Sequence, residues 1–212
     1  MNYDEKTALR LEIANSISHG IGILFGLACI PLLTALATKT NSIRSIVGAS
    51  VYGFCFLMLF TFSTLFHGFR HPTARQVLKI LDHISIYFLI AGTYTPFILN
   101  YYFNTTGIVM LSVLWGLTLI GIFFKLFFVN RFNIISTIIY LLMGWIMIWG
   151  GRAFFNALPH AVVVLIAIGG GLYSMGVVFY LWEKPKWNHL VWHLFVLAAA
   201  GCHYVAVLLT VA

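Results

Sequence analysis

The feature that most constrains this chain is a succession of long apolar stretches separated by short polar segments. A helix needs about 20 apolar residues to cross the ~30 Å hydrocarbon core of a bilayer. Stretches of about that length lie at Ile13–Ala37, Ile43–His67, Ile80–Leu99, Ile108–Val129, Ile134–Phe155, Ala161–Trp182 and His189–Ala212. Because backbone polar groups in lipid must be satisfied within the segment, each stretch is expected to be a helix. The sequence therefore predicts an all-α polytopic membrane protein, with seven transmembrane helices in a single domain over residues 1–212.

The composition supports a chain whose outer surface faces lipid. Only 8% of the residues are charged, the mean hydropathy is +0.98, and a soluble domain carries about 25% charged residues. We therefore expect a multi-pass protein of the cell membrane, either a plasma or an inner membrane. The weakest boundary between predicted spans is Asn130–Asn133, a polar break of only four residues. An alternative with six spans would require two of the apolar segments to be buried or re-entrant.

The first apolar stretch has some features of a cleaved signal. Lys6 and Arg10 precede it, and Ala35-Leu36-Ala37 resembles a cleavage site. Its apolar region of about 25 residues is longer than the 7–15 residues of a signal peptide. We therefore interpret it as a retained span.

The placement of lysine and arginine predicts the orientation, because cytoplasmic loops carry an excess of these residues. With the N-terminus inside, nine of the twelve are cytoplasmic: Lys6, Arg10, Arg70, Arg75, Lys79, Lys125, Arg131, Lys184 and Lys186. The three outside are Lys39, Arg44 and Arg152. We therefore predict a cytoplasmic N-terminus and an external C-terminus. The net charge of +7 then follows from topology and from attraction to anionic lipid, and it does not indicate nucleic-acid binding.

Polar side chains inside or bordering the spans are costly and are functional candidates. In the predicted orientation, the cytoplasmic ends of four spans carry Glu12, Asn15, His19, Ser63, His67, Asp82, His83, His189 and His193. Four spans thus bring carboxylates and imidazoles to one layer of the inner leaflet. Scattered core histidines would have no reason to share a depth. The cysteines Cys29, Cys55 and Cys202 all lie in apolar stretches and are interpreted as small core residues.

The spacing of His189 and His193 places both imidazoles on one helix face. They are either metal ligands or interfacial histidines beside aromatic residues. The arrival of His67 at the same depth favours the metal, because three neutral imidazoles and one open position suit catalytic Zn²⁺. Asp82 can accept a hydrogen bond from a metal-bound water or orient a ligand; its alternative role is a helix-start carboxylate. Ser63 lies one turn before His67, where it can bond water or substrate, or its own helix backbone.

The remaining histidines differ in their prospects as ligands. Pro72 disfavours helix at His71, so this residue is not expected to pair with the histidine four residues before it. His203 is 14 residues beyond His189, or ~21 Å along a helix, so it is expected to satisfy a buried hydrogen bond or line a polar cavity. His83 remains an alternative ligand. His160 is expected in a solvated outer loop.

Glu12, Asn15 and His19 share one helix face at spacings of three and four residues. They are expected to support the site or to make capping and interhelical hydrogen bonds.

Taken in order along the chain, these motifs resemble the hemolysin III family, the bacterial branch of the progestin and adipoQ receptor superfamily. The carriers are Glu12-x-x-Asn15-x-x-x-His19, Ser63-x-x-x-His67, Leu81-Asp82-His83, Gly92-Thr93-Tyr94-Thr95-Pro96, and His189-x-x-x-His193 followed by His203. The resemblance covers essentially the whole chain. It implies seven helices with zinc on the cytoplasmic side, held by His67, His189 and His193. Asp82 would hold a water, with Ser63 beside it. The superfamily is also similar to alkaline ceramidases, which hydrolyse a lipid amide.

Three functions are consistent with these features. The first is a zinc-dependent intramembrane hydrolase acting on a lipid amide or ester, with Asp82 as general base. The second is a non-enzymatic, lipid-sensing regulator of membrane homeostasis in which zinc is a structural clamp. The third is a cytolysin, as the family name implies, although no amphipathic free segment is visible. The soluble metalloprotease class is excluded by the absence of a His-Glu-x-x-His motif. Membrane lipids are the expected partners.

Overall fold

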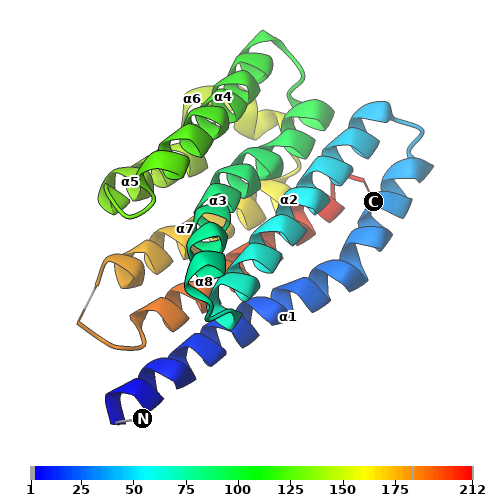
Figure 1. The fold of residues 1–212 in the computed structure, drawn as a ribbon. Coiled ribbons are helices and arrows are strands. Elements are labelled where there is room, and N and C mark those ends of the chain that lie inside the picture. The colour runs from blue at the N-terminus through cyan, green and yellow to red at the C-terminus, as the bar shows by residue number, and fades with distance from the viewer. Residues whose placement is uncertain (1–2, 183, 212) are drawn as a thin grey trace.

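The computed structural model describes residues 3–182 and 184–211 and shows an all-helical chain over them. Its helices are α1 (Tyr3–Lys39), α2 (Ile43–Gly68), α3 (Pro72–Tyr101), α4 (Thr105–Phe128), α5 (Asn133–Gly144), α6 (Met147–Ala157), α7 (His160–Leu181) and α8 (Asn188–Leu208). The helices run side by side along one long direction (Figure 1).

The described part of the chain contains seven segments that are long and apolar enough to cross a membrane, as predicted. The fifth, Asn133–Ala157, is broken into α5 and α6, which the sequence did not predict. At this break the Tyr94 hydroxyl donates a hydrogen bond of 2.5 Å to the carbonyl of Gly144. A broken helix is tolerated at membrane depth when neighbouring side chains satisfy the backbone groups that it frees.

The helix boundaries extend several of the predicted spans. Helix α1 begins at Tyr3, ten residues before the predicted apolar stretch. Helix α3 begins at Pro72, and His71 before it is extended with φ −60° and ψ 124°, as the proline predicted. The predicted end of the last span, Ala212, lies outside the described residues.

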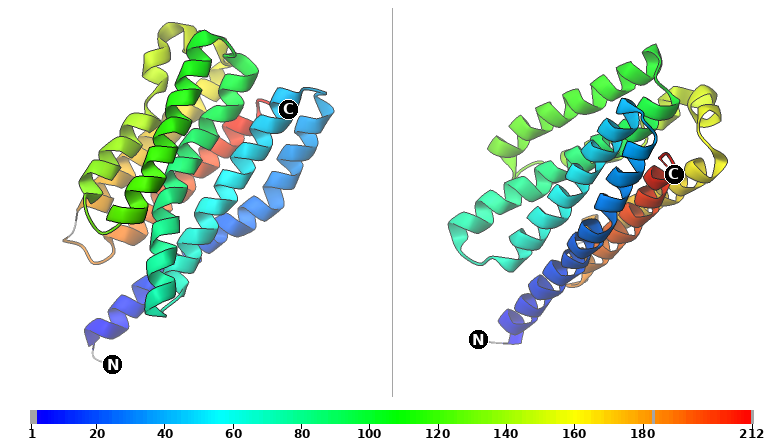
Figure 2. Two further views of the ribbon diagram at one scale, coloured as in Figure 1. Left: turned by 45° about the horizontal axis from the view of Figure 1, so that its top comes forward. Right: turned by 90° about the vertical axis from the view of Figure 1, so that its right-hand side faces the viewer.

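The packing places α2 at the centre of one half of the bundle. Helix α2 packs extensively against α1 and α3, and α7 packs against α8. Helix α1 lies on one side of the bundle, and α4, α5 and α6 lie on the other (Figures 1 and 2). The α2–α3 contact is close because both helices present glycine to it: an added Cβ at Gly48 would lie 2.8 Å from the Cα of Pro96. Small residues allow such close approach of membrane helices.

The two ends of the chain lie at opposite ends of the bundle (Figure 2), as an odd number of spans requires. Which end is cytoplasmic stays a prediction from the distribution of lysine and arginine. The middle of α1, the end of α2 and the starts of α3 and α8 lie near one another, and the first turns of α1 project beyond them (Figures 1 and 2). These are the four segments on which the sequence placed the polar residues.

Candidate metal centre

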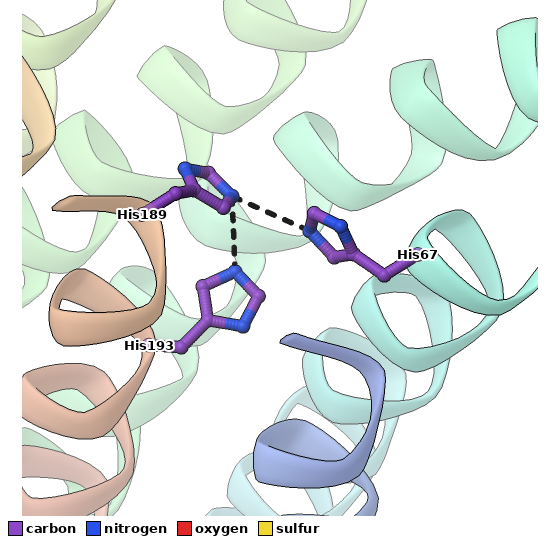
Figure 3. A group of neighbouring side chains, drawn as sticks. All are labelled: His67, His189 and His193. Atoms are coloured by element: carbon purple, nitrogen blue, oxygen red, sulfur yellow. Dashed lines mark hydrogen bonds between the residues drawn. The ribbon is translucent and has the colours of Figure 1, made fainter. Parts of the chain in front are cut away.

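Three imidazoles from two helices converge near the N-terminal end of the bundle. His67 lies in the last turn of α2, while His189 and His193 lie in the first two turns of α8. The Nε2 atom of His189 is 3.3 Å from Nε2 of His67 and 3.1 Å from Nε2 of His193 (Figure 3). One nitrogen from each of the three rings lies within 4.8 Å of the others. This group can hold a metal ion.

The orientation of His67 is set by a carboxylate from α1. Its Nδ1 lies 2.6 Å from Oε2 of Glu12. The other carboxylate oxygen, Oε1, accepts a hydrogen bond from the guanidinium of Arg75 on α3. The Glu12 side chain therefore ties together three helices and fixes the direction in which Nε2 of His67 points.

His193 is held by groups on α1. Its Nδ1 lies 3.3 Å from the backbone carbonyl oxygen of Asn15 and 3.4 Å from the hydroxyl of Ser18. The ring of His19 stacks on the His193 ring, with centroids 3.7 Å apart and planes 18° apart. Both nitrogens of His19 are buried without a hydrogen-bond partner in the described part of the chain.

These contacts determine which nitrogens carry protons. A carboxylate or carbonyl oxygen can only accept a hydrogen bond, so the Nδ1 atoms of His67 and His193 are the donors. Each of these neutral rings then directs the lone pair of Nε2 toward the same point. The Nε2 of His189 can carry at most one proton, which cannot serve both neighbours at once. Hydrogen bonds alone therefore leave this cluster of lone pairs unsatisfied.

The donor set and spacing fit a zinc ion. Zinc–nitrogen bonds of 2.0–2.1 Å in a tetrahedral arrangement require about 3.3–3.4 Å between ligand nitrogens. The two Nε2–Nε2 distances are 3.3 and 3.1 Å. His67 and His193 are 5% and 2% exposed, so a bound cation would be largely shielded from solvent. A carboxylate on the outer nitrogen of a ligand histidine is also a recurrent feature of zinc sites.

A cavity opens from this cluster into the bundle. Its polar end is lined by His19, Ser63, Asp82, His83, His189 and His193. The Ser63 side chain interacts with the Asp82 carboxylate. The rest of the wall is mostly apolar and comes from α2, α3, α5, α7 and α8. Among the described residues, Asp82 lines the cavity but is not part of the three-nitrogen group.

The other predicted residues are distributed as follows. His83 lines the cavity, but its Nδ1 lies 2.8 Å from the carbonyl oxygen of Lys79, and it is not part of the metal-binding group. His203 lines the far end of the cavity, where its Nε2 lies 3.3 Å from the carbonyl oxygen of Ile166. His71 is exposed outside the group. His160 is exposed too, but it is the first residue of α7 and not part of a loop.

Two of the polar residues predicted on α1, Glu12 and Asn15, contact the candidate ligand histidines. Glu12 supports His67 through its side chain, whereas Asn15 contacts His193 through its backbone carbonyl. The Oδ1 atom of Asn15 is buried without a partner among the described residues.

Sequence reasoning missed Arg75 and Ser18. Arg75 was counted only as a topology signal, although it lies seven residues before Asp82 and so on the same face of α3. That spacing could have placed it near the site. Nothing in the sequence pattern distinguishes Ser18 from other small polar residues in α1.

Known proteins with similar sequences indicate the family of this chain. The family described as "Haemolysin-III related" matches residues 7–204. The chain belongs to the haemolysin III family. It is 42% identical over 200 residues to the hemolysin-3 homolog of Bacillus subtilis (strain 168), covering 94% of each chain. It is also 42% identical over 197 residues to hemolysin-3 of Bacillus cereus, covering 93% of this chain and 90% of that protein.

A more distant relative is human. The chain is 28% identical over 176 residues to the monocyte to macrophage differentiation factor of Homo sapiens, which covers 76% of this chain and 69% of that protein. No solved structure matches the chain. The resemblance noted from the sequence motifs is thus confirmed at the level of the family.

Proposed function

We propose that this haemolysin III protein is a zinc-dependent hydrolase that cleaves an amide or ester bond of a membrane lipid. The observation that carries the proposal is the convergence of three imidazole nitrogens at the polar end of a largely apolar cavity. His67, His189 and His193 would hold the zinc. A bound zinc ion would act as a Lewis acid toward the scissile carbonyl and lower the pKa of water toward ~7.

Asp82 is the residue positioned to move protons. It lines the cavity beside the three histidines but is not part of their group among the described residues. Its carboxylate can accept a proton from the attacking water and pass it to the departing amine or alcohol. Ser63 interacts with this carboxylate, and both residues line the cavity.

The cavity suits the hydrocarbon part of a lipid. Its wall runs from His189 to His203 on α8, which is ~21 Å along a helix. Half of a bilayer core is ~15 Å thick, so the lining residues span a length comparable to that of one acyl chain. Leu89, Ile90 and Phe97 supply part of the apolar wall. A lipid with its carbonyl at the histidines and its chain along α3 and α8 would bury its apolar surface.

The replacement Asp82→Asn tests the catalytic assignment. Asparagine keeps the shape and hydrogen-bonding capacity but cannot take a proton. We expect zinc content to persist while fatty-acid release from a panel of lipid amides and esters falls by ~10²–10⁴-fold. Asp4→Asn is the matched control, because Asp4 is exposed, pairs with Lys186 and does not line the cavity. Unchanged release by the Asp82→Asn protein would remove Asp82 from the mechanism.

A second candidate function is a lipid-sensing regulator in which zinc is structural. It is favoured by the position of the ligands, which join α2 to α8, whereas α8 packs chiefly on α7 and α1. A metal there would clamp two helices that otherwise share little contact. In this case Asp82→Asn would leave the membrane-homeostasis phenotype intact, and His189→Ala would abolish it. Undetectable release by the wild-type protein across the panel would favour this function.

A further inference from the structure

A lysine is buried inside the bundle away from the metal centre. Lys125 lies in α4 with none of its surface exposed. Its Nζ has no hydrogen-bond partner among the described residues. The hydroxyl of Tyr87 on α3 is buried as well, and the side chains of Ser136 and Tyr140 interact with it. A buried ammonium without a partner and a buried tyrosine hydroxyl therefore occur in one part of the protein.

Helices α3 and α4 bring these two groups together. Lys79, His83 and Tyr87 are spaced by four residues and share one face of α3. On α4, Gly121 precedes Lys125 by one turn, and a Cβ at Gly121 would lie 2.6 Å from the Tyr87 ring. Since helix side chains tend to lean toward the N-terminus of their helix, we expect the Lys125 stem to lean toward Gly121 and thus toward Tyr87.

Helix α5 closes the third side of this region. The ring of Tyr140 lies edge-on to Tyr87, with centroids 4.5 Å apart. The Ser136 side chain also interacts with Tyr87. The Lys125 ammonium is repelled electrostatically by Lys79 and would be repelled by a charged His83, and both of these residues lie on α3. The Nζ atom of Lys79 donates a hydrogen bond of 2.8 Å to Oδ1 of Asn130, which is neutral. The site is thus a polar region between α3, α4 and α5 that contains two cationic side chains.

Three of the described acidic side chains have other partners. Glu12 is engaged by His67 and Arg75. Asp82 interacts with Ser63, and Asp4 pairs with Lys186. A charge buried in a membrane protein is costly unless it is paired. A lysine near a helix end could reach the interface through its long stem, but here the ammonium is buried.

We propose that Lys125, Lys79 and Tyr87 form a binding site for a phosphate group, supplied by the headgroup of an anionic lipid. A phosphate would provide the missing counter-charge for two lysines and an acceptor for the tyrosine hydroxyl. In the predicted orientation this end of the bundle faces the cytoplasmic leaflet, where basic pockets between helices bind anionic headgroups. The site is separate from the three-histidine centre and does not depend on the hydrolase proposal.

The test compares anionic and neutral lipid around the purified full-length protein. Nanodiscs are prepared from phosphatidylcholine alone or with phosphatidylglycerol, and bound lipid is counted by native mass spectrometry alongside thermal unfolding. We expect phosphatidylglycerol to bind and stabilise the wild-type protein. Lys125→Gln should weaken this binding by about 10–100-fold, the loss expected for a charged hydrogen bond. Lys125→Arg should retain it, and Lys6→Gln, which removes an exposed charge from α1, should behave as wild type.

A titration with inorganic phosphate in phosphatidylcholine nanodiscs distinguishes the source of the group. Stabilisation by free phosphate that disappears in Lys125→Gln would keep the anion site but overturn the lipid as its source. Equal binding of phosphatidylglycerol by the wild-type and Lys125→Gln proteins would overturn the site. If Lys125→Gln does not fold, Tyr87→Phe carries the same comparison. A wild-type protein without preference for phosphatidylglycerol over phosphatidylcholine would also refute it.

Discussion

The contact between Glu12 and His67 makes the metal centre testable without touching a ligand. The Glu12 carboxylate lies 2.6 Å from Nδ1 of His67 and accepts a second hydrogen bond from Arg75. In Glu12→Gln the amide oxygen can still accept from one of these partners, but the charge that both contacts use is lost. In Glu12→Ala both contacts disappear, and the His67 ring is free to rotate.

The magnitude follows from the role of this carboxylate. Removing an outer partner of a metal-bound histidine typically costs 10–100-fold in metal affinity, which corresponds to about 1.4–2.8 kcal/mol. We expect Glu12→Gln near the lower value and Glu12→Ala near the upper value. The loss should exceed that of an exposed surface ion pair, because the His67 side chain is 3% exposed.

The assay is zinc affinity, measured by competition with a chelator on detergent-solubilised protein. Asp4→Asn is the control, because it removes one carboxylate from the same helix about two turns away, where the side chain is 77% exposed. It should leave zinc affinity unchanged. Wild-type affinity in both Glu12 variants would refute the argument that this carboxylate holds His67 in place for a metal.

Three further predictions address topology, ligands and packing. A reporter that is active only outside the cell should work when fused after Ala212 and fail within Arg70–Lys79; the reverse result would place the histidines at the outer leaflet. Purified protein should hold about one zinc per chain, His193→Ala should lose most of it and His203→Ala should not, as measured by metal analysis. Gly92→Val should destabilise the α2–α3 contact by about 1–3 kcal/mol in thermal or chemical unfolding, since even a Cβ there would lie 2.7 Å from a side chain of α2; unchanged stability would show that this contact can relax.

Much of the metal centre could be predicted because depth in a membrane is encoded along the chain. The ends of the apolar stretches determine which polar residues share a layer, and a spacing of four residues places His189 and His193 on one face. The exclusion of His203 from the metal-binding group rested on the rise of the helix alone. The structure places His203 at the far end of the cavity. These inferences needed only the period of the helix and the thickness of the bilayer.

Other features depended on how each helix is rotated and which helices are neighbours. The choice between His67 and His83 beside α8, the contact of Arg75 with Glu12, and the break after Gly144 were decided only by tertiary packing. In a soluble protein the polar face of a helix marks the side that points to water. Here lipid is as apolar as the protein interior, so the sequence pattern carries little contrast between the two faces of a helix. The sequence by itself therefore determined which residues share a depth, and the packing of close helix surfaces decided which of them meet.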